Sequence, residues 1–302
     1  YRTAIDRGAK KLYGMRHGIQ GLLNEDYIDL SEHIQTDLDV ELLKRTPAAY
    51  LGSCRYKLPE IHEDIATYDK IFSILDKLEI ECFIYIGGND SMDTIKKLSD
   101  YAILRGHPTK FLGVPKTIDN DLALTDHTPG YGSAAKYIGT SVKEIIQDSQ
   151  ALIYDKGLVT IVEIMGRNAG WLVGAAALSK GEDCDGPDLI YVPELPFDID
   201  NFLVRIKELL AEKTFVVVAV SEGIRLADGR YVCELTDGVD FVDAFGHKQL
   251  TGTANYLARR LAQEIGCKTR TIELSSMQRA ASHLASRIDI LEAFQVGGAA
   301  VK

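Results

Sequence analysis

Short apolar runs rich in β-branched residues alternate with longer amphipathic stretches along most of this chain. Such alternation is typical of helices that cover a mainly parallel sheet, and it predicts an α/β fold. The predicted strands are Cys82–Ile86, Phe111–Val114, Leu158–Ile164, Asp188–Val192, Thr214–Val220 and Thr269–Leu274. The predicted helices are Asp64–Leu78, Met92–Arg105, Gly132–Gln150, Asn168–Ser179, Ile199–Glu212, Leu250–Ile265 and Met277–Ala293.

Bulk properties narrow the possible functions. A chain of 302 residues is long enough for about two domains with their own cores. Its formal charge of −10 disfavours binding to nucleic acid or to anionic membranes. No apolar stretch reaches the roughly 20 residues that cross a bilayer, and the first residues lack a signal-peptide pattern. The five cysteines are scattered and odd in number, so we expect a reducing, cytoplasmic setting.

The segment Gly113–Asp121 reads Gly-Val-Pro-Lys-Thr-Ile-Asp-Asn-Asp. Pro115 has a fixed φ and pushes Val114 toward extended backbone, so the polar residues that follow leave a strand on a rigid connection. The pattern favours a phosphoryl-transfer site in which Asp119 accepts a proton from a sugar hydroxyl and Lys116 neutralises charge on the phosphoryl group. A solvated acidic turn is the alternative for this segment taken alone.

Two glycines, Gly87 and Gly88, follow the predicted strand Cys82–Ile86, and a helical pattern comes after Ser91. Glycine lets backbone N–H groups approach a phosphate, and a helix N-terminus adds partial positive charge. The segment therefore predicts a phosphate-binding turn, although an ordinary glycine turn with Ser91 as N-cap fits equally well. Asp90 in this segment either holds a metal ion or repels an anionic ligand.

Further segments place guanidinium or carboxylate groups beside predicted strands and helices. Guanidinium groups suit phosphate oxygens, and a carboxylate at a strand end can accept hydrogen bonds from sugar hydroxyls. The segments are Gly52–Lys57 with Arg55, Met165–Trp171 with Arg167, Ser221–Gly223 with Glu222, the strand residue Arg270, and Gln278 with Arg279 at the start of the last helix. Each of them taken singly also fits a solvated loop or ordinary surface charge.

Several reaction classes lack their sequence patterns. There is no His-x-x-x-His pair, no Gly-x-Ser-x-Gly elbow and no Gly-x-x-x-x-Gly-Lys-Ser/Thr loop. No strand is followed by Gly-x-Gly-x-x-Gly with an acidic residue about 20 positions later. Zinc hydrolases, serine hydrolases, P-loop enzymes and Rossmann dehydrogenases are therefore disfavoured.

Five segments together closely resemble the phosphofructokinase family, in order and spacing over nearly the whole chain: Gly-Gly-Asn-Asp-Ser at 87–91, Pro-Lys-Thr-Ile-Asp-Asn-Asp at 115–121, Met-Gly-Arg at 165–167, Ser-Glu-Gly at 221–223 and Gln-Arg at 278–279. The resemblance implies two Rossmann-like three-layer domains that face a shared cleft. Residues 1–130 with 278–302 would bind the phosphoryl donor, and residues 131–277 would bind fructose 6-phosphate. The implied glycolytic reaction is magnesium-dependent phosphorylation of the C1 hydroxyl to give fructose 1,6-bisphosphate.

The resemblance also implies a role for each site residue. The catalytic residues would be Asp119 as general base, with Lys116, Asp90 and Arg167. Substrate would be bound by Thr117, Ile118, Asp121, Met165, Gly166, Glu222, Arg270, Ser276, Met277, Gln278 and Arg279. The donor would be bound by Arg55, Gly87, Gly88 and Ser91, and Mg²⁺ by Asn89 and Asp121. Some of these residues would reach in from a neighbouring subunit, so we expect a homo-oligomer, a dimer or a tetramer.

Two positions favour pyrophosphate over ATP as the donor. The ATP-dependent members generally have glycine where this chain has Asp90 and Lys116, whereas the pyrophosphate-dependent branch is similar to this chain at both. A carboxylate about 4 Å from an α-phosphate oxygen would cost roughly 4 kcal/mol at an effective dielectric constant near 20, which is about a thousandfold in affinity. Pyrophosphate has no third phosphate to clash, and its use implies a nearly reversible reaction.

The chain also departs from the family pattern. Asn89 stands where most members have an aspartate, and an amide is a weaker ligand for Mg²⁺. Leu158 stands where several ATP-dependent members have an arginine for the sugar phosphate. The sequence begins after the family's first strand and its glycine-rich donor loop, and ends before its closing segments. An ATP-dependent enzyme and a catalytically silent sugar-phosphate-binding chain are therefore the alternatives.

Overall fold

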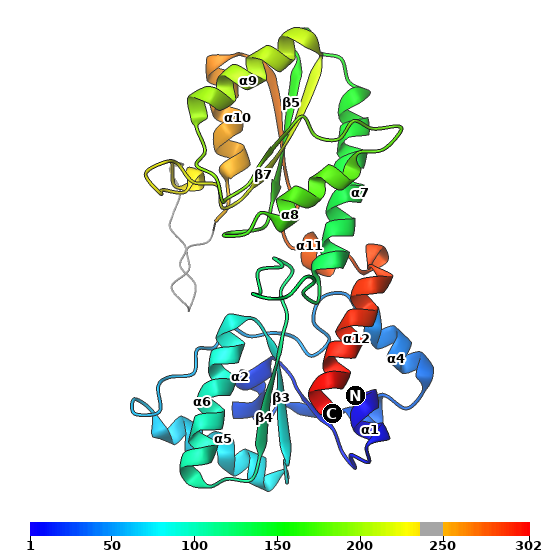
Figure 1. Cartoon of the computed structure of the whole chain (residues 1–302), viewed down its shortest axis with the longest axis vertical. Coiled ribbons are helices and arrows are strands. Elements are labelled where there is room, and N and C mark those ends of the chain that lie inside the picture. Colours follow the sequence, from blue (N-terminus) through cyan, green and yellow to red (C-terminus); the bar gives the residue numbers. More distant parts are fainter. Residues whose placement is uncertain (236–249) are drawn as a thin grey trace. The chain divides into compact units, whose positions relative to one another are not determined.

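The computed structural model describes residues 1–235 and 250–302. Within these ranges the chain forms two compact units (Figure 1). Unit 1 contains residues 1–117 and 287–302, and unit 2 contains residues 118–235 and 250–286. These bounds follow packing alone. The assignment of donor binding to residues 1–130 with 278–302, and of sugar binding to residues 131–277, stays a prediction.

Unit 2 is built on a parallel sheet with the strand order β6-β7-β5-β8. Its strands are β5 Leu158–Ile164, β6 Leu189–Tyr191, β7 Phe215–Ser221 and β8 Lys268–Glu273. The central strand β5 is buried along its whole length because both faces of the sheet are covered. The prediction of a parallel α/β sheet is thus confirmed, and β5 has the predicted bounds.

Helices cover both faces of this sheet (Figure 1). On one face, Val162 and Ile164 pack with α7 Tyr131–Gln150, α8 Trp171–Gly174 and the 3₁₀ helix η1 Ala175–Ser179. On the other face, Val159 and Ile161 pack with α9 Ile199–Glu212 and α10 Thr253–Glu264. Since side chains alternate along a strand, Glu163 falls on the α10 face. The remaining short helices of unit 2 are η2 Val232–Leu235, α11 Met277–Ala280 and η3 Ser282–Leu284.

Unit 1 contains a parallel strand pair, β3 Cys82–Gly87 with β4 Lys110–Pro115, and an antiparallel pair, β1 Tyr13–Met15 with β2 Tyr27–Asp29. Its core brings together α2 Gly18–Leu23, α5 Ile65–Lys77 and α6 Asn89–Arg105 around the buried rings of Tyr68 and Tyr101. The other helices are α1 Arg2–Asp6, α3 Leu30–His33, α4 Asp37–Lys44 and α12 Arg287–Val301. In the parts of the chain that the structure describes, every helix is too short or too polar to traverse a lipid bilayer.

The predicted helix Met277–Ala293 is wrong, because the structure divides this segment into α11, η3 and α12. Ala281 and Ala285 leave helical backbone angles, with ψ values of 70° and 136°. The chain bonds to α7 here instead of to its own next turn, since Ser286 N–H donates to Ser133 Oγ at 3.0 Å. An amphipathic pattern does not encode such long-range bonds.

The predicted helix Asn168–Ser179 is wrong at its start, because α8 begins only at Trp171. Arg225 Nη2 donates to Asn168 Oδ1 at 2.7 Å, and Gly170 N–H donates to Glu194 Oε1 at 2.6 Å. Tertiary hydrogen bonds thus take the place of the first helical turn. The periodicity also predicts no element before Asp64, where the structure has α1 to α4 with β1 and β2.

Candidate functional site

In unit 1, two of the predicted site segments lie side by side at the carboxyl ends of paired strands. β3 and β4 run parallel in a register that places Gly87 opposite Pro115. Lys116 N–H donates to Gly87 O at 2.9 Å, which joins the glycine turn to the start of the Lys116 segment. The side chains of Asp90 and Lys116 are both exposed beyond this edge. Ligands of parallel α/β sheets bind at such edges.

The glycine turn is shaped by the N-terminus of α6. Gly88 is the N-cap, and no side chain caps the helix. The alternative in which Ser91 is the N-cap is therefore wrong, since Asn89, Asp90 and Ser91 form the first helical turn. A Cβ at Gly87 would lie 2.0 Å from Ser91 Oγ, so only glycine fits there. An uncapped N-terminus of a helix of this length is a favourable place for a phosphate group.

Arg55 lies in a segment without regular secondary structure that the partly buried Tyr85 and the buried Lys97 attach to the glycine turn and α6. The Tyr85 hydroxyl on β3 hydrogen-bonds both Cys54, the neighbour of Arg55, and Ser91. Burial, with Cys54 nearby, raises the pKa of Tyr85 to about 12, so the hydroxyl stays neutral. Lys97 on α6 donates to Leu58 O at 3.1 Å. The structure therefore brings the Arg55 segment and the glycine turn together.

In unit 2, the loops after β5 and β7 interlock. Ser221 Oγ donates to Gly166 O at 2.6 Å, and Glu222 N–H donates to Ile164 O at 2.9 Å. Gly166 has a φ of 133°, which favours glycine. A Cβ at Gly223 would lie 2.1 Å from Arg167 O, so backbone packs directly on backbone. Gly166 and Glu222 are thus held by hydrogen bonds between the two loops.

The segment Ser276–Arg279 is fastened to the same loops by Gln278. This side chain is 3 % exposed, and its Oε1 accepts a hydrogen bond from Met165 N–H at 3.2 Å. Its Nε2 donates to Ser275 O at 3.1 Å. Ser276, Met277 and Arg279 remain exposed. Gln278 therefore anchors this segment to the loop after β5, and its predicted contact with the substrate stays a prediction.

The charges of the predicted site gather around Glu222. Burial raises the pKa of the Glu222 carboxyl to about 7. A hydrogen bond from Gly166 N–H opposes this rise, the charge of Asp119 adds to it, and the charges of Arg167 and Arg279 oppose it. These groups are close enough to act on one carboxyl, so unit 2 assembles two carboxylates and two guanidinium groups.

The loop that carries Asp119 and Asp121 is closed by the residue between them. Asn120 is 5 % exposed and adopts a left-handed φ of 56°. Its Oδ1 accepts from Thr128 N–H at 2.9 Å, and its Nδ2 donates to Asp126 O at 3.0 Å. Asparagine tolerates this backbone region better than most residues. Asn120 is therefore a structural residue of the site that the sequence reasoning did not single out.

The boundary between the two units falls, in the sequence, between Thr117 and Ile118. Ile118 belongs to unit 2, where its Cγ2 lies 3.0 Å from the position of a Cβ on Gly130. Thr117 is the last residue of the first stretch of unit 1. The predicted 115–121 segment thus contributes residues to both units.

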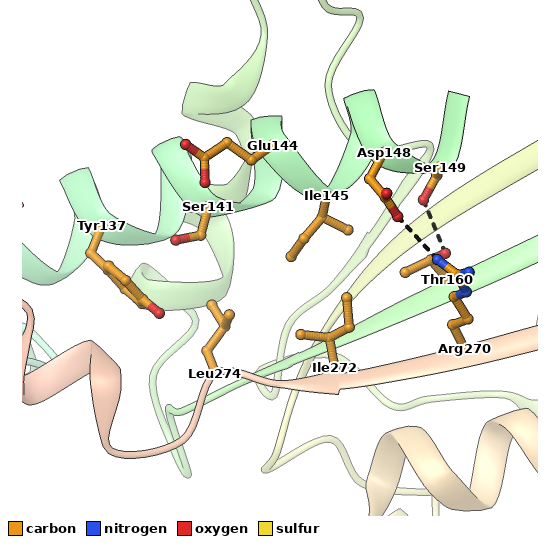
Figure 2. A pocket seen from close by; sticks show the side chains of 10 residues that line it. All are labelled: Tyr137, Ser141, Glu144, Ile145, Asp148, Ser149, Thr160, Arg270, Ile272 and Leu274. Atoms are coloured by element: carbon orange, nitrogen blue, oxygen red, sulfur yellow. Dashed lines mark hydrogen bonds and ion pairs between the residues drawn. The ribbon is translucent and has the colours of Figure 1, made fainter. Parts of the chain in front are cut away.

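Arg270 is not gathered around Glu222 in this chain. It lies on β8 opposite Thr160, within the sheet and away from the loop that follows Ile164. Its Nη1 forms an ion pair with Asp148 Oδ2 on α7 at 3.0 Å. Both side chains line a pocket of about 350 Å³ between α7 and β8, shown in Figure 2.

One buried acidic residue was missed by the sequence reasoning. Glu163 is 5 % exposed on β5, and burial raises the pKa of its carboxyl to about 7. The signal was present as a single acid in the apolar run Leu-Val-Thr-Ile-Val-Glu-Ile. A charged residue inside a buried strand requires a partner, and here the partner is the N-terminus of α10.

The donor set predicted for Mg²⁺ consists of oxygen ligands. Asn89 and Asp90 are exposed at the start of α6, and Asp121 is exposed on the 115–121 segment. No group of three or more acidic, histidine or cysteine side chains suited to a metal occurs among residues 1–235 and 250–302. Mg²⁺ in phosphoryl-transfer sites takes one or two carboxylates and completes its shell with phosphate oxygens and water. Asn89 and Asp90 in unit 1 and Asp121 in unit 2 each supply an oxygen ligand of this kind.

The chain is similar to several known proteins over nearly its whole length. The family model described as Phosphofructokinase matches residues 1–302. A pyrophosphate--fructose 6-phosphate 1-phosphotransferase of Xanthomonas campestris is 42% identical over 97% of this chain and 69% of its own length. One of Halomonas elongata is 40% identical over 97% and 68%. The crystal structure of a pyrophosphate-dependent phosphofructokinase from Nitrosospira multiformis matches with a TM-score of 0.83 and 32% identity, over 99% of this chain and 70% of that one.

Proposed function

Because the chain belongs to the phosphofructokinase family, we propose that it transfers a phosphoryl group from pyrophosphate to the C1 hydroxyl of fructose 6-phosphate. Two relatives named pyrophosphate--fructose 6-phosphate 1-phosphotransferase are about 40% identical to this chain over nearly its whole length. The product is fructose 1,6-bisphosphate. Phosphoryl transfer from pyrophosphate and from the C1 phosphate of the product has a comparable free energy, so the reaction runs in both directions.

The observation that carries the proposal is the charge cluster around Glu222. A sugar phosphate presents hydroxyl groups and a dianion, and the cluster offers carboxylates for the hydroxyls and guanidinium groups for the anion. Glu222 accepts hydrogen bonds from sugar hydroxyls, and Arg279 binds a phosphate oxygen. Met165, Gly166 and the Ser276–Met277 turn form the wall of the sugar site.

Asp119 takes the proton of the C1 hydroxyl as that oxygen attacks phosphorus. The hydroxyl becomes strongly acidic only as its bond to phosphorus forms, so this base needs no large pKa shift. Arg167 and Lys116 stabilise the charge that collects on the transferring phosphoryl group. Thr117 and Asp121 position it for in-line attack. Phosphoryl transfer depends mainly on such positioning and charge stabilisation.

Pyrophosphate binds at the uncapped start of α6, with Gly87, Gly88, Ser91 and Arg55 around it. The exposed carboxylate of Asp90 in the first turn of α6 would repel an additional phosphate, and Lys116 begins the segment bonded to Gly87. Both observations support a short inorganic donor over a nucleotide. Asp121 and Asn89 would hold Mg²⁺ together with phosphate oxygens, and the ion would neutralise donor charge.

Arg270 is best explained as a residue that serves a neighbouring subunit. It lies on β8 away from Glu222 of its own chain and is held by Asp148. The proposal therefore includes a homo-oligomer, in which Arg270 of one subunit reaches the sugar phosphate of another. A cytoplasmic setting completes the proposal, supported by five cysteines that are all free thiols.

The test is a coupled assay that measures fructose 1,6-bisphosphate formed with Mg²⁺ and either pyrophosphate or ATP. We expect kcat/KM to be about a thousandfold higher with pyrophosphate. Asp90→Asn removes the repelling charge and is expected to raise kcat/KM for ATP. Asp100→Asn, which removes an exposed carboxylate from the same helix, serves as the matched control and changes neither donor. Equal use of both donors by the parent chain would refute the donor assignment.

A further inference from the structure

A buried carboxylate that the proposed reaction does not use lies in the central strand of unit 2. Glu163 is 5 % exposed on β5. Its Oε2 accepts a hydrogen bond from Ala254 N–H at 2.8 Å, and Gly252 N–H donates to it as well. Both donors belong to the N-terminus of α10. The partial positive charge of a helix end favours a carboxylate there, so Glu163 fixes the position at which α10 begins.

The same helix end is bonded to the backbone of Glu222. Thr253 is completely buried, and its Oγ1 donates to Glu222 O at 3.2 Å. On the other side, Glu222 N–H donates to the carbonyl oxygen of Ile164, the residue after Glu163. The main chain of Glu222 is therefore held twice by β5, once directly and once through α10.

We propose that Glu163 is a positioning residue for the fructose 6-phosphate site, which holds Glu222 in place through the N-terminus of α10. The inference rests on the proposed function, in which Glu222 accepts hydrogen bonds from the sugar. Glu163 touches no substrate in this scheme, because it is enclosed between the sheet and α10. Loss of its carboxylate would leave the N–H groups of α10 without an acceptor and release Thr253 from its place.

The two carboxylates are also linked by charge. Burial raises the pKa of Glu163 to about 7, where the charges of Glu273 and Glu222 add to the rise and the N–H groups of Ala254 and Gly252 oppose it. An ionised Glu163 disfavours a second negative charge on Glu222, so removal of its charge lets Glu222 ionise at a lower pH. The other titratable or charged groups around this pair are Cys233 on η2, and Asp119, Arg167 and Arg279 beside Glu222.

Two variants separate the hydrogen bond from the charge. Glu163→Gln keeps an acceptor for Ala254 N–H, and we expect the inflection in the pH dependence of KM for fructose 6-phosphate to move to lower pH. Glu163→Leu removes the acceptor, and we expect that KM to rise about tenfold. In both variants kcat and the KM for pyrophosphate stay close to the parent values. Glu264→Gln, which changes an exposed glutamate at the other end of α10, is the control and leaves all these constants unchanged.

Thr253→Val tests the same connection at its other end, and it keeps the inference falsifiable if Glu163→Leu fails to fold by circular dichroism. It removes the hydroxyl that donates to Glu222 O but keeps the shape of the side chain, and it must raise the KM for fructose 6-phosphate. A parent-like KM in folded Thr253→Val would overturn the inference. An unshifted pH profile in Glu163→Gln would reduce Glu163 to a helix cap and overturn it as well.

Calorimetry with fructose 6-phosphate separates this inference from the proposed function. If the parent chain binds the sugar phosphate without turnover, the proposed reaction is wrong, and the dissociation constants of the variants decide the role of Glu163. If the parent turns over and the variants match it, the reaction stands and the inference is wrong. A parent that neither binds nor turns over the sugar overturns both.

Discussion

Gly223 lies where the loop after β7 packs directly on the loop after β5, which we propose forms part of the sugar site. A Cβ on it would lie 2.1 Å from Arg167 O and 2.6 Å from the carbonyl carbon of Arg167. These are backbone atoms, which cannot turn aside as the end of a flexible side chain can. Any larger residue must therefore displace the turn that carries Gly166 and Arg167.

We expect Gly223→Ala to raise the KM for fructose 6-phosphate and lower kcat, together by about a hundredfold in kcat/KM, because a shift of about 1 Å in a site has effects of that order. Steady-state kinetics and thermal unfolding measure the effect. Gly174→Ala is the matched control, since Gly174 has αR angles and no atom within 4 Å of a Cβ. Parent-like kinetics in Gly223→Ala would mean that the loops yield easily and that their packing does not define the site.

Helix α6 is joined to the Arg55 segment by one buried cation. Lys97 is 7 % exposed, donates to Leu58 O, and forms ion pairs with Glu60 at 2.8 Å and Asp93 at 2.9 Å. Burial lowers the pKa of Lys97, but the bonds to both carboxylates outweigh burial and raise it overall. The cation therefore stays charged and connects α6, whose start forms the proposed phosphate-binding turn, to the segment before Pro59.

Replacement of Lys97 by methionine is expected to lower the free energy of unfolding by about 2 kcal/mol, less than for a fully buried pair because Glu60 and Asp93 are half-exposed and regain water. We also expect a higher KM for pyrophosphate, since the Arg55 segment loses its link to α6. Lys96→Met provides the comparison, because Lys96 is exposed and its ion pair with Asp100 lies at the surface. Equal stabilities of the two variants in urea unfolding would disprove the role given to Lys97.

Hydrophobic periodicity predicts some helices and strands of this chain correctly and others not. Strand β5 and helix α9 have their predicted bounds, because each is regular, long enough and packed on one sheet. The segment Met277–Ala293 has an equally helical pattern, but bonds such as Ser286 N–H to Ser133 Oγ divide it. Element types follow from local pattern, whereas interruptions depend on partners far away in the sequence.

Some residues of the candidate site could likewise be predicted from the sequence, and others could not. The glycine turn and the Lys116 segment were predicted from local chemistry, and parallel pairing of β3 with β4 then places them together. The resemblance to the family supplied the roles of Asp119, Arg167 and Glu222. The sequence reasoning did not single out Asn120 or Glu163, because each accepts a buried hydrogen bond from a backbone N–H group that local pattern does not specify.

At the scale of the whole molecule, an acidic chain must bind two polyanions. Its formal charge is −10, so the cations have to be concentrated locally. Arg167 and Arg279 are concentrated at Glu222 in this way. Arg270 is the exception, since it is paired with Asp148 in the pocket of Figure 2. A shared site between subunits explains the exception and can be tested by complementation.

Asp119→Asn and Arg270→Ala should each be nearly inactive alone, since in the proposed mechanism one lacks the base and the other lacks a phosphate ligand. If Arg270 serves a neighbour, a mixed oligomer contains sites built from the intact Asp119 of one subunit and the intact Arg270 of the other. Random co-assembly in equal amounts through a two-fold interface then restores roughly a quarter of the parent activity. Co-expression of Asp119→Asn with Arg167→Ala is the control, because both residues belong to unit 2 of one chain and no complete site can form. No recovery in the first mixture, or equal recovery in both, would show that Arg270 does not act across subunits.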